Sequence, residues 1–212
     1  MTQVSIIDHG LGNVLSAIRA FEHLGLTVDL VTHGEQLKAP SRIVIPGVGA
    51  FPEAMRQLNT SGLTDAIIRE VKRGVPILGI CLGMQVLFSK GHEYETVSGL
   101  GLLKGTVSQI SNSTVNGESL RVPVVGWRKI SMPGDLAKTN LLSSEIIGKS
   151  YYFVHSYSAH PTDKEVISGV YHRGDEQVVS AVINDHVMGV QFHPEKSGED
   201  GLQLLELFSK LG

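Results

Sequence analysis

The sequence predicts an α/β fold with a mostly parallel central sheet flanked by helices and with antiparallel β additions in the second half. Before residue 99, short apolar runs alternate with segments of helical periodicity, which is typical of a parallel sheet covered on both faces. From residue 99 onward, short β-like runs follow one another directly. The 212 residues, 42% of them hydrophobic, suffice for one substantial core, so we expect a single domain over residues 1–212.

In the first half, apolar residues at the 3.6-residue period of a helix alternate with strand-like runs. Gly25 follows the first helical stretch and is expected to end that helix. The expected strands are Val4–Ile7, Thr27–Val31, Arg42–Ile45 and Val75–Ile80. The buried stripes of the expected helices are Val14, Ala17, Ile18 and Phe21, and Leu63, Ile67 and Val71.

The second half is expected to add antiparallel strands to the parallel sheet, because its β-like runs are short and close together. These runs are Thr106–Ile110, Arg121–Val125, Tyr151–Tyr157, Val166–Tyr171, Val178–Ile183 and Val187–Phe192. After the last run, apolar residues recur at helical spacing from Asp200 to Leu211, which predicts a C-terminal helix.

Charge and cysteine content argue against several classes of protein. The formal net charge is -3 and the pI is near 6.3, so no cationic field attracts nucleic acid or an anionic membrane surface. The single cysteine cannot form an internal disulfide, which favours a cytoplasmic location. The first residues lack the basic start of a secretory leader, and no apolar run approaches the ~20 residues that span a bilayer. We therefore expect neither a nucleic-acid partner nor a membrane location.

A Gly-x-Cys-x-Gly pattern centred on Cys81 follows an apolar, strand-like run. This spacing is typical of a nucleophile elbow, in which a reactive side chain sits on a tight, strained turn between a strand and a helix. Gly79 and Gly83 leave room for the turn because neither carries a Cβ atom. The free N–H groups of the following helix favour the thiolate. The pattern predicts a nucleophilic Cys81, although a lone buried cysteine is more often an inert apolar residue.

His193 and Glu195 place an imidazole and a carboxylate at the end of the last strand-like run. In a cysteine triad the histidine takes and returns the proton, while the carboxylate fixes its tautomer. Because the chain has nine histidines, a pair of this kind on an exposed loop is the alternative interpretation. The combination with the elbow favours a triad of Cys81, His193 and Glu195.

A Pro-Gly-x-Gly loop over residues 46–51 follows the strand Arg42–Ile45. Glycines at a strand end let the backbone approach a ligand and present N–H groups to it. Acyl chemistry needs such donors for its oxyanion, so we expect one N–H from this loop and one from Leu82. A plain glycine-rich turn is the alternative. A phosphate-binding loop is disfavoured because no lysine follows and the third glycine of the dinucleotide fingerprint is missing.

Residues 81–85 (Cys-Leu-Gly-Met-Gln) and 191–197 (Gln-Phe-His-Pro-Glu-Lys-Ser) resemble the two signatures of the class I (triad) glutamine amidotransferases. Within that family the chain is most similar to the glutaminase subunits of imidazole glycerol phosphate synthase, of histidine biosynthesis. The similarity covers nearly the whole chain. It also includes Asp8, Gly10, Gly12, Asn13, residues 46–51, residues 99–102, Gly126, Trp127 and residues 152–157.

The resemblance implies that Cys81 attacks the side-chain amide of glutamine, that His193 transfers a proton to the departing nitrogen, and that Glu195 orients His193. Water then hydrolyses the glutamyl thioester, so the products are glutamate and ammonia, and no cofactor is expected. By the same resemblance, the oxyanion hole is expected at Gly49 and Leu82, and binding of the amino-acid end of glutamine at Gln85, Ser156 and Tyr157. Without it, Gln85 is interpreted as an ordinary helix residue and Tyr157 as a core aromatic.

The resemblance also implies a heterodimer with a (β/α)₈ cyclase subunit that receives the ammonia and forms imidazole glycerol phosphate and aminoimidazole carboxamide ribotide. Trp127 and Tyr152 match the docking face, and a buried β-hairpin is the alternative use of such residues. The chain departs from the family pattern at Val124, Val125 and Arg128. These departures leave open a paralogous glutaminase that supplies ammonia to a sugar-aminating synthase of surface-polysaccharide assembly.

Two other classes stay open. One is a cysteine hydrolase of esters or lactones with an α/β-hydrolase fold, but that fold places its acid before its histidine, whereas Glu195 follows His193. The other is a binding module with an inert cysteine. A metal site is not expected, because the pairs His155 with His160 and His193 with Glu195 each lack a third ligand.

Overall fold

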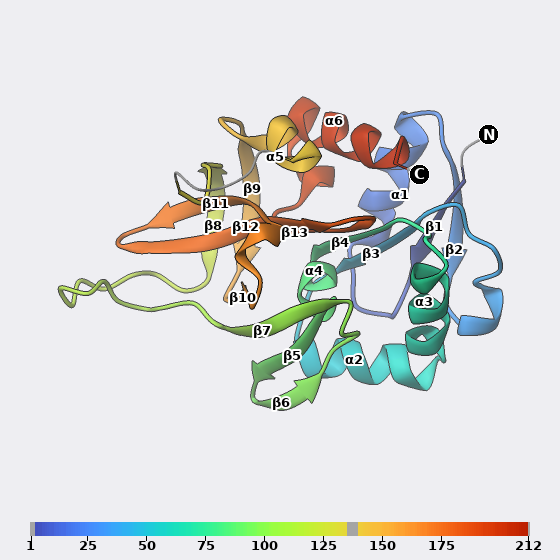
Figure 1. The fold of residues 1–212 in the computed structure, drawn as a ribbon, viewed down its shortest axis with the longest axis horizontal. Helices are drawn as coiled ribbons and strands as arrows, with labels where there is room; N and C mark the ends of the chain where they lie inside the picture. Colours follow the sequence, from blue (N-terminus) through green and yellow to red (C-terminus); the bar gives the residue numbers. More distant parts are fainter. Residues whose placement is uncertain (1–2, 135–139, 212) are drawn as a thin grey trace.

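The centre of the molecule is a seven-stranded sheet with the order β11-β12-β13-β4-β3-β1-β2 (Figure 1). The structure, a computed structural model, describes residues 3–134 and 140–211; residues 1–2, 135–139 and 212 of the domain expected over 1–212 lie outside the described residues. The single-domain organisation stays a prediction. The strands of the sheet are β1 (Gln3–Ile7), β2 (Thr27–Val31), β3 (Ile43–Gly47), β4 (Ile77–Cys81), β11 (Ile167–Arg173), β12 (Glu176–Asn184) and β13 (Val187–Val190).

Most of this sheet is parallel. Strands β2, β1, β3, β4 and β13 pair in parallel, whereas β12 and β11 continue the sheet antiparallel at one edge. Strands β3, β4 and β13 are buried along their whole length, as expected for strands covered on both faces. The register places Gly47 beside Cys81, so the carboxyl ends of β3 and β4 lie side by side. The expected fold class is confirmed.

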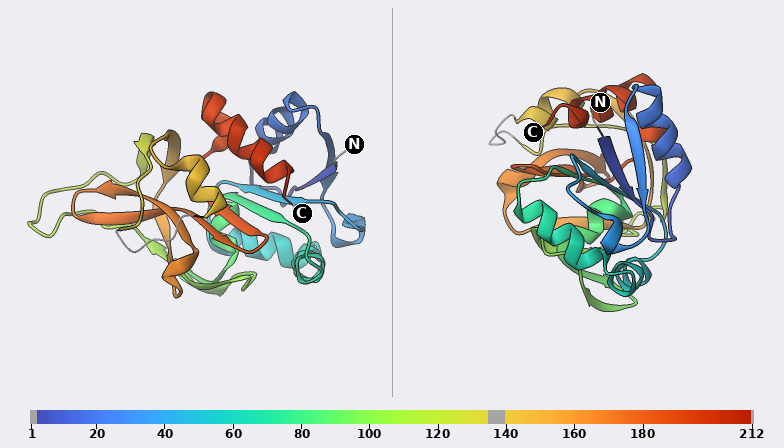
Figure 2. Two further views of the ribbon diagram at one scale, coloured as in Figure 1. Left: turned by 45° about the horizontal axis from the view of Figure 1, so that its top comes forward. Right: turned by 90° about the vertical axis from the view of Figure 1, so that its right-hand side faces the viewer.

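Helices cover both faces of the central sheet (Figures 1 and 2). Helices α1, α5 and α6 pack on one face with residues such as Val44 and Leu78, and α2 and α3 pack on the other with Ile43 and Ile45. Successive strand residues point to opposite faces, so each buried strand supplies both layers. No helix within the described residues is long and apolar enough to cross a bilayer. The helices are α1 (Val14–His23), α2 (Phe51–Thr60), α3 (Leu63–Lys72), α4 (Leu82–Val86), α5 (Leu141–Ile146) and α6 (Gly198–Ser209), with 3-10 helices η1 (Gly34–Gln36), η2 (Lys164–Val166) and η3 (Pro194–Lys196).

Helix α2 was not predicted, because the glycine-rich loop was expected to extend to Phe51. Phe51 instead begins the helix, with Pro52 in its first turn, where the missing N–H of a proline costs no hydrogen bond. The spacing of its buried residues is the signal that indicates the helix. These residues are Phe51, Ala54, Met55 and Leu58.

The expectation that every β-like run of the second half extends the central sheet was wrong for three of them. The runs Thr106–Ile110, Arg121–Val125 and Tyr151–Tyr157 contribute to two separate small sheets. Their strands are β5 (Phe88–Glu93), β6 (Glu95–Ser98), β7 (Leu103–Gln109) and β10 (Tyr157–Pro161) in one, and β8 (Val124–Lys129) and β9 (Ser150–His155) in the other. The run from 151 to 157 is split at Ser156, where the chain passes from one small sheet to the other. Strand β13 also differs from the expectation, because it pairs in parallel with β4.

Candidate active site

Cys81 stands between β4 and α4 with φ 56° and ψ -110°, a backbone conformation that non-glycine residues rarely adopt. Gly79 and Gly83 permit this turn. A Cβ atom at Gly79 would lie 2.4 Å from the Gly83 carbonyl oxygen, and one at Gly83 would lie 1.7 Å from the Ile45 carbonyl oxygen. Both distances are far shorter than van der Waals contact, so the Gly-x-Cys-x-Gly spacing follows from the close packing of α4 on β3 and β4.

Helix α4, which follows Cys81, is short. It spans five residues, and β5 begins soon after it at Phe88. A helix of this length aligns few peptide dipoles behind the sulfur of Cys81. What it supplies are the free N–H groups of its first turn, together with a fixed direction for the side chain.

The sulfur of Cys81 has polar neighbours from distant parts of the chain. Its S–H faces the carbonyl oxygen of Val154 at 3.7 Å, and the side-chain amide of Gln191 donates to the sulfur at 3.6 Å. Cys81 and His193 also interact, and this interaction raises the pKa of His193. The fold therefore brings the predicted nucleophile and the predicted proton carrier into contact.

His193 lies between Cys81 and Glu195. Its Nδ1–H donates to Oε1 of Glu195 at 2.8 Å, and both side chains are 3% exposed. This bond leaves Nε2 as the nitrogen available to Cys81. Burial lowers the pKa of His193, but the hydrogen bonds with Cys81 and Glu195 outweigh burial and raise it to about 10. The imidazole thus holds its proton at neutral pH and is able to donate it.

The turn that carries His193 is tied to β9 by the main chain. The N–H of His193 donates to the Tyr152 carbonyl at 2.9 Å, and the N–H of Tyr152 donates to Oγ of Ser197 at 3.0 Å. Helix α6 packs directly against the same turn, because a Cβ atom at Gly201 would lie 1.9 Å from the Pro194 carbonyl oxygen. Residues outside the 191–197 signature therefore help to position the histidine.

Cys81 opens into a cavity of about 550 Å³, a size typical of small-molecule sites. All the residues predicted for the oxyanion hole and for substrate binding line this cavity. They are Gly49, Leu82, Gln85, Ser156 and Tyr157. His193 and Glu195 are not among the lining residues, so the cavity meets the triad only at the sulfur.

Gly49 lies two residues after the end of β3, Leu82 directly follows Cys81 at the end of β4, and both line the cavity together with Cys81. Gly49 has φ +101°, a conformation that favours glycine. Leu82 is the first residue of α4, where a backbone N–H has no acceptor within the helix. Their role as oxyanion donors is still a prediction.

Gln85 is 5% exposed and reaches from α4 to the opposite wall of the cavity. Its side-chain amide donates to the Tyr157 carbonyl at 3.1 Å and to Oε1 of Gln191 at 3.0 Å. Gln85 therefore connects the elbow to the Ser156–Tyr157 segment.

Three further polar residues at this site were not predicted from the sequence: Glu93, His155 and Gln191. Glu93 and His155 line the cavity, and the Glu93 carboxylate accepts the N–H of Phe51 at 2.7 Å. Gln191 is fully buried and contacts both Cys81 and Gln85. The position of Gln191 in the same signature as His193 was a usable signal. Glu93 lies in β5, which was not predicted, and His155 is one polar residue within the expected strand Tyr151–Tyr157, so neither stands out in the sequence. No group of three or more metal-binding side chains occurs among residues 3–134 and 140–211.

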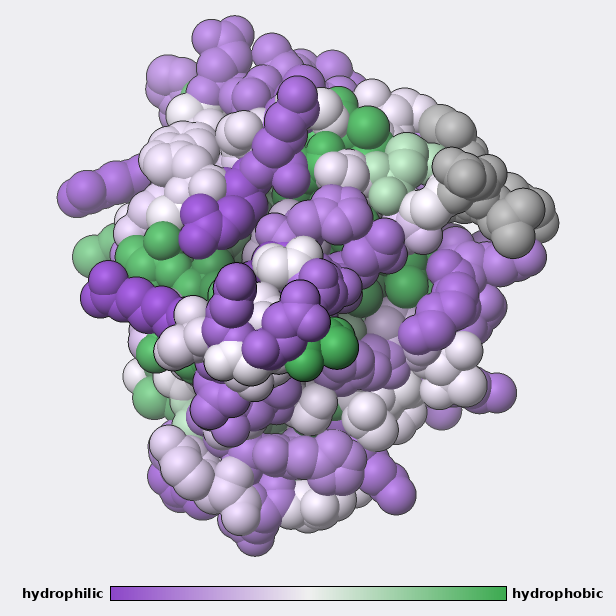
Figure 3. Space-filling view, turned by 90° about the vertical axis from the view of Figure 1, so that its left-hand side faces the viewer, coloured by the Kyte–Doolittle hydropathy of each residue, from purple (hydrophilic) through white to green (hydrophobic). Residues whose placement is uncertain are grey.

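Trp127 and Tyr152 face each other across the β8–β9 ribbon, with ring centroids 6.1 Å apart in an edge-on arrangement. Trp127 is 54% exposed, and the neighbouring cross-strand pair of Val125 and Val154 is also exposed. Alternate residues of a strand share a face, so these four side chains form one surface, which we call the ribbon face. Figure 3 shows apolar patches among polar side chains on the side of the molecule where the ribbon lies. The alternative of a buried hairpin is wrong for Trp127.

The other face of the ribbon is part of the core. Tyr151 and Phe153 are fully buried there and both rings contact Phe192, at centroid distances of 4.1 and 5.5 Å. The aromatic run in β9 therefore contributes Tyr151 and Phe153 to the core on one face and Tyr152 to the ribbon face on the other.

Comparisons with known proteins agree with this geometry. Residues 5–210 match the family profile described as "Glutamine amidotransferase class-I". The chain is 40% identical over 216 residues to "Imidazole glycerol phosphate synthase subunit HisH 1" of Legionella pneumophila (strain Lens), covering 100% of both proteins. It is 40% identical over 211 residues to the HisH subunit of Moorella thermoacetica, covering 100% of this chain and 96% of that protein. It is also 40% identical to "Imidazole glycerol phosphate synthase hisHF, chloroplastic" of Arabidopsis thaliana, covering 97% of this chain and 33% of that protein.

Solved structures share the fold at lower sequence identity. The structure of PurLQS from Thermotoga maritima matches with a TM-score of 0.72 at 20% identity, covering 97% of this chain and 96% of that one. The profile match, the full-length similarity and the fold lead to one conclusion: the chain belongs to the class I glutamine amidotransferase family.

Proposed function

We propose that this protein hydrolyses L-glutamine to L-glutamate and ammonia through a thioester on Cys81. The observation that carries the proposal is the contact of Cys81 with His193, whose Nδ1 is bonded to the buried Glu195, at the wall of a cavity of substrate size. Membership of the glutamine amidotransferase family supports the same chemistry.

In the first half-reaction, the sulfur of Cys81 forms a bond with the side-chain carbonyl carbon of glutamine. The N–H groups of Gly49 and Leu82 stabilise the oxyanion of the tetrahedral intermediate. His193 donates its proton to the amide nitrogen, so the carbon–nitrogen bond breaks and ammonia leaves. The high pKa of His193 keeps that proton in place until the nitrogen becomes basic.

In the second half-reaction, water attacks the thioester carbonyl and His193 takes a proton from it. The carbon–sulfur bond then breaks, glutamate leaves, and Cys81 and His193 return to their starting states. Glu195 stabilises the imidazolium through its bond to Nδ1. Each step uses groups of this chain and water alone.

The cavity also suits the charged amino-acid end of glutamine. Glu93 offers a carboxylate to the ammonium group, and it is held in place by the N–H of Phe51 at the start of α2. Ser156, Tyr157 and Gln85 supply further polar groups to the lining of the cavity. The fit of one anion and several neutral polar groups favours an amino acid over a simple ester.

The partner in this proposal is a (β/α)₈ cyclase subunit, bound as a heterodimer and receiving ammonia to form imidazole glycerol phosphate and aminoimidazole carboxamide ribotide in histidine biosynthesis. The names of relatives at 40% identity over the full chain support this assignment, as does the exposed ribbon face around Trp127. The reaction uses metabolites of the cell interior, so we also propose a cytoplasmic location.

The departures at Val124, Val125 and Arg128 bear on the choice of acceptor. Val125 belongs to the ribbon face, whereas Val124 is buried and Arg128 donates to the Trp127 carbonyl at 2.9 Å. Because one altered side chain, Val125, lies on the ribbon face, a sugar-aminating synthase is the second candidate for the partner that receives the ammonia. Both versions share the glutaminase chemistry and differ only in the partner.

The decisive experiment measures glutamate release by the chain alone, with the cyclase subunit, and with the cyclase subunit plus the acceptor ribotide. We expect glutamate release with the partner and its loss in Cys81→Ser. Failure of the complete mixture to hydrolyse glutamine would contradict the proposal. Hydrolysis that responds to a sugar-aminating synthase and not to the cyclase would establish the second acceptor instead.

A further inference from the structure

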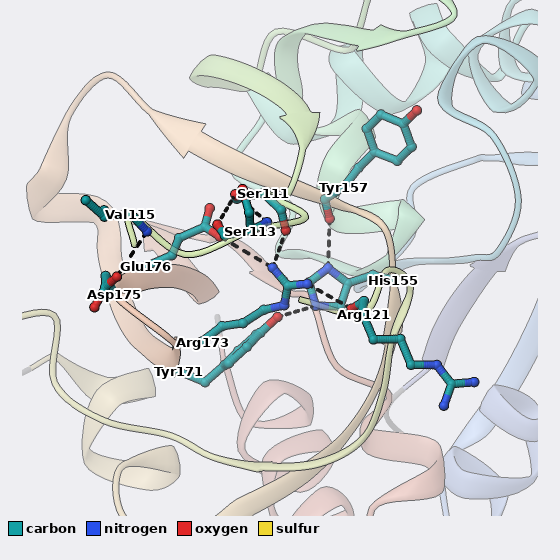
Figure 4. A network of polar contacts seen from close by, with 10 residues as sticks. All are labelled: Ser111, Ser113, Val115, Arg121, His155, Tyr157, Tyr171, Arg173, Asp175 and Glu176. Atoms are coloured by element: carbon teal, nitrogen blue, oxygen red, sulfur yellow. Dashed lines mark hydrogen bonds and ion pairs between the residues drawn. The ribbon is translucent and has the colours of Figure 1, made fainter. Parts of the chain in front are cut away.

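The Ser156–Tyr157 segment of the cavity wall is held by a chain of hydrogen bonds that starts at a buried tyrosine (Figure 4). The hydroxyl of Tyr171 lies 3.0 Å from Nε2 of His155, and Nδ1 of His155 lies 2.8 Å from the carbonyl oxygen of Tyr157. His155 is 5% exposed and Tyr171 is 1% exposed. Gln85 donates to the same Tyr157 oxygen at 3.1 Å. One carbonyl group at the edge of the cavity is thus fixed from two sides.

These partners determine the tautomer of His155. A carbonyl oxygen only accepts, so Nδ1 must carry the proton that is donated to Tyr157. Nε2 then has a free lone pair and accepts the O–H of Tyr171. Every polar atom of the two side chains is therefore satisfied while His155 is neutral.

The surroundings keep His155 neutral. Burial lowers its pKa to about 4, opposed by the bond to Tyr157 and reinforced by Arg173 on β11, His193 after β13 and Arg128 on β8. Arg173 is itself occupied, because it donates to the carbonyl oxygens of Ser111 and Arg121 and closes the base of the loop between them (Figure 4). Arg173 also pairs with Glu176 at 3.9 Å, and the charged side chains that shift the pKa of His155 are all cations, so each of them disfavours a proton on His155.

We propose that His155, supported by Tyr171, is a positioning residue for the glutamine site that fixes the direction of the Ser156–Tyr157 segment. The inference rests on the proposed function, since it takes this segment as part of the substrate site. Strand β9 ends at His155 and pairs with β8, whereas β10 begins at Tyr157 and pairs with β7; the Ser156 carbonyl also accepts the N–H of Ile110 at 3.0 Å. Only Ser156 of this segment lies between the two strands, and the bond from His155 at the end of β9 to the Tyr157 carbonyl at the start of β10 joins the two sheets at this point.

The test compares glutamine hydrolysis by the complete complex with the cyclase subunit for the wild type, His155→Leu, His155→Asn and Tyr171→Phe. Loss of one hydrogen bond to the Tyr157 carbonyl is expected to raise KM about tenfold in His155→Leu and to change kcat less than about twofold. His155→Asn places an amide N–H near the position of Nδ1 and is expected to restore most of the KM. Tyr171→Phe keeps the first bond but leaves Nε2 without its donor, so we expect a KM increase of about threefold.

His172→Asn is the matched control, because His172 is the exposed neighbour of Tyr171 on β11, and its KM is expected to equal that of the wild type. Alkylation of Cys81 by iodoacetamide reports on the nucleophile without glutamine and should proceed at the wild-type rate in every variant. In protein labelled with ¹⁵N-histidine, His155 is expected to show the neutral Nδ1–H tautomer.

A fall in kcat at unchanged KM in His155→Leu would overturn the proposal, as would equal KM values for the Leu and Asn variants. If circular dichroism shows that a His155 variant does not fold, the Tyr171→Phe variant takes its place, because it keeps the ring that contacts Phe153. An unchanged KM for glutamine in Tyr171→Phe would also overturn the proposal. Absence of hydrolysis by the wild-type complex contradicts the proposed function itself, so the two failures are distinguishable.

Discussion

The catalytic corner at the ends of β4 and β13 and the ribbon face beside it are built in opposite ways. In the corner, the side chains of His193 and Glu195 are each 3% exposed and bonded to each other. On the ribbon face, Trp127 is 54% exposed and its ring contact is the edge of Tyr152. The triad of the corner therefore comes from this chain, with Oε2 of Glu195 left without a hydrogen-bond partner among the described residues, whereas the ribbon face leaves apolar area for a second protein to cover. Corner variants should lose chemistry with or without the partner, and ribbon variants should lose only the partner.

The largest expected effect is at the nucleophile. Cys81→Ser is expected to lower kcat/KM for glutamine by at least about 10⁴-fold, because a serine hydroxyl is a much poorer nucleophile in a site arranged for sulfur. Glutamate release measured with and without the cyclase subunit checks this, and the loss should be equal in both. If the activity of Cys81→Ser returned when the partner was added, the nucleophile would not be supplied by Cys81 of this chain.

Glu195→Gln is expected to lower kcat/KM by about 10³-fold, since the neutral amide no longer stabilises the imidazolium. The bond to Glu195 raises the pKa of His193, so removing the charge lowers that pKa. In the wild type His193 holds its proton up to about pH 10, and in the variant the alkaline limb of the pH–rate profile should move to lower pH. Glu199→Gln, at an exposed position in the first turn of α6, is the control and should leave the profile in place.

Gly83→Ala tests whether the corner depends on close packing as much as on its polar groups. The added Cβ would lie 1.7 Å from the Ile45 carbonyl oxygen, so α4 must move away from β3. We expect the free energy of unfolding to fall by about 3 kcal/mol, measured by urea denaturation. Gly12→Ala is the control, because its nearest contact at 3.4 Å is ordinary. Equal stability of the two variants would show that α4 has room to shift.

Trp127→Ala tests whether the ribbon face binds the cyclase subunit. Truncation of an exposed aromatic residue in an interface is expected to weaken binding of the cyclase subunit about 30-fold, or about 2 kcal/mol. The melting temperature should stay close to that of the wild type. Leu15→Ala is the control, since Leu15 is 67% exposed on α1. Titration calorimetry measures both, and equal affinities would remove the ribbon face from the proposed interface.

The local parts of the fold followed well from the sequence. Strand-like apolar runs such as Arg42–Ile45 and Val75–Ile80 correspond to buried parallel strands because burial on both faces leaves an uninterrupted apolar pattern. The pairing of the second-half strands could not be predicted, because the sequence of a β-like run such as Thr106–Ile110 does not indicate which strand it pairs with. Register and partner choice depend on contacts between segments far apart in the chain.

The same distinction holds in the candidate site. The elbow and the His193 signature are local patterns, and each was visible in the sequence. The contact between Cys81 and His193, and the place of Glu93 and His155 in the cavity wall, depend on four or more elements meeting at one point. Burial of a polar residue, which is what gives His155 its importance, is a property of the assembled structure.

The side chain and the main chain of Tyr152 have different roles, which matters for redesign of the subunit contact. Its side chain belongs to the outer surface of β9, while its N–H and carbonyl groups bond to Ser197 and His193. Side-chain substitutions there leave both main-chain bonds intact, so specificity can be re-engineered residue by residue. An insertion, a deletion or a proline at that position would instead shift the backbone on which the imidazole depends.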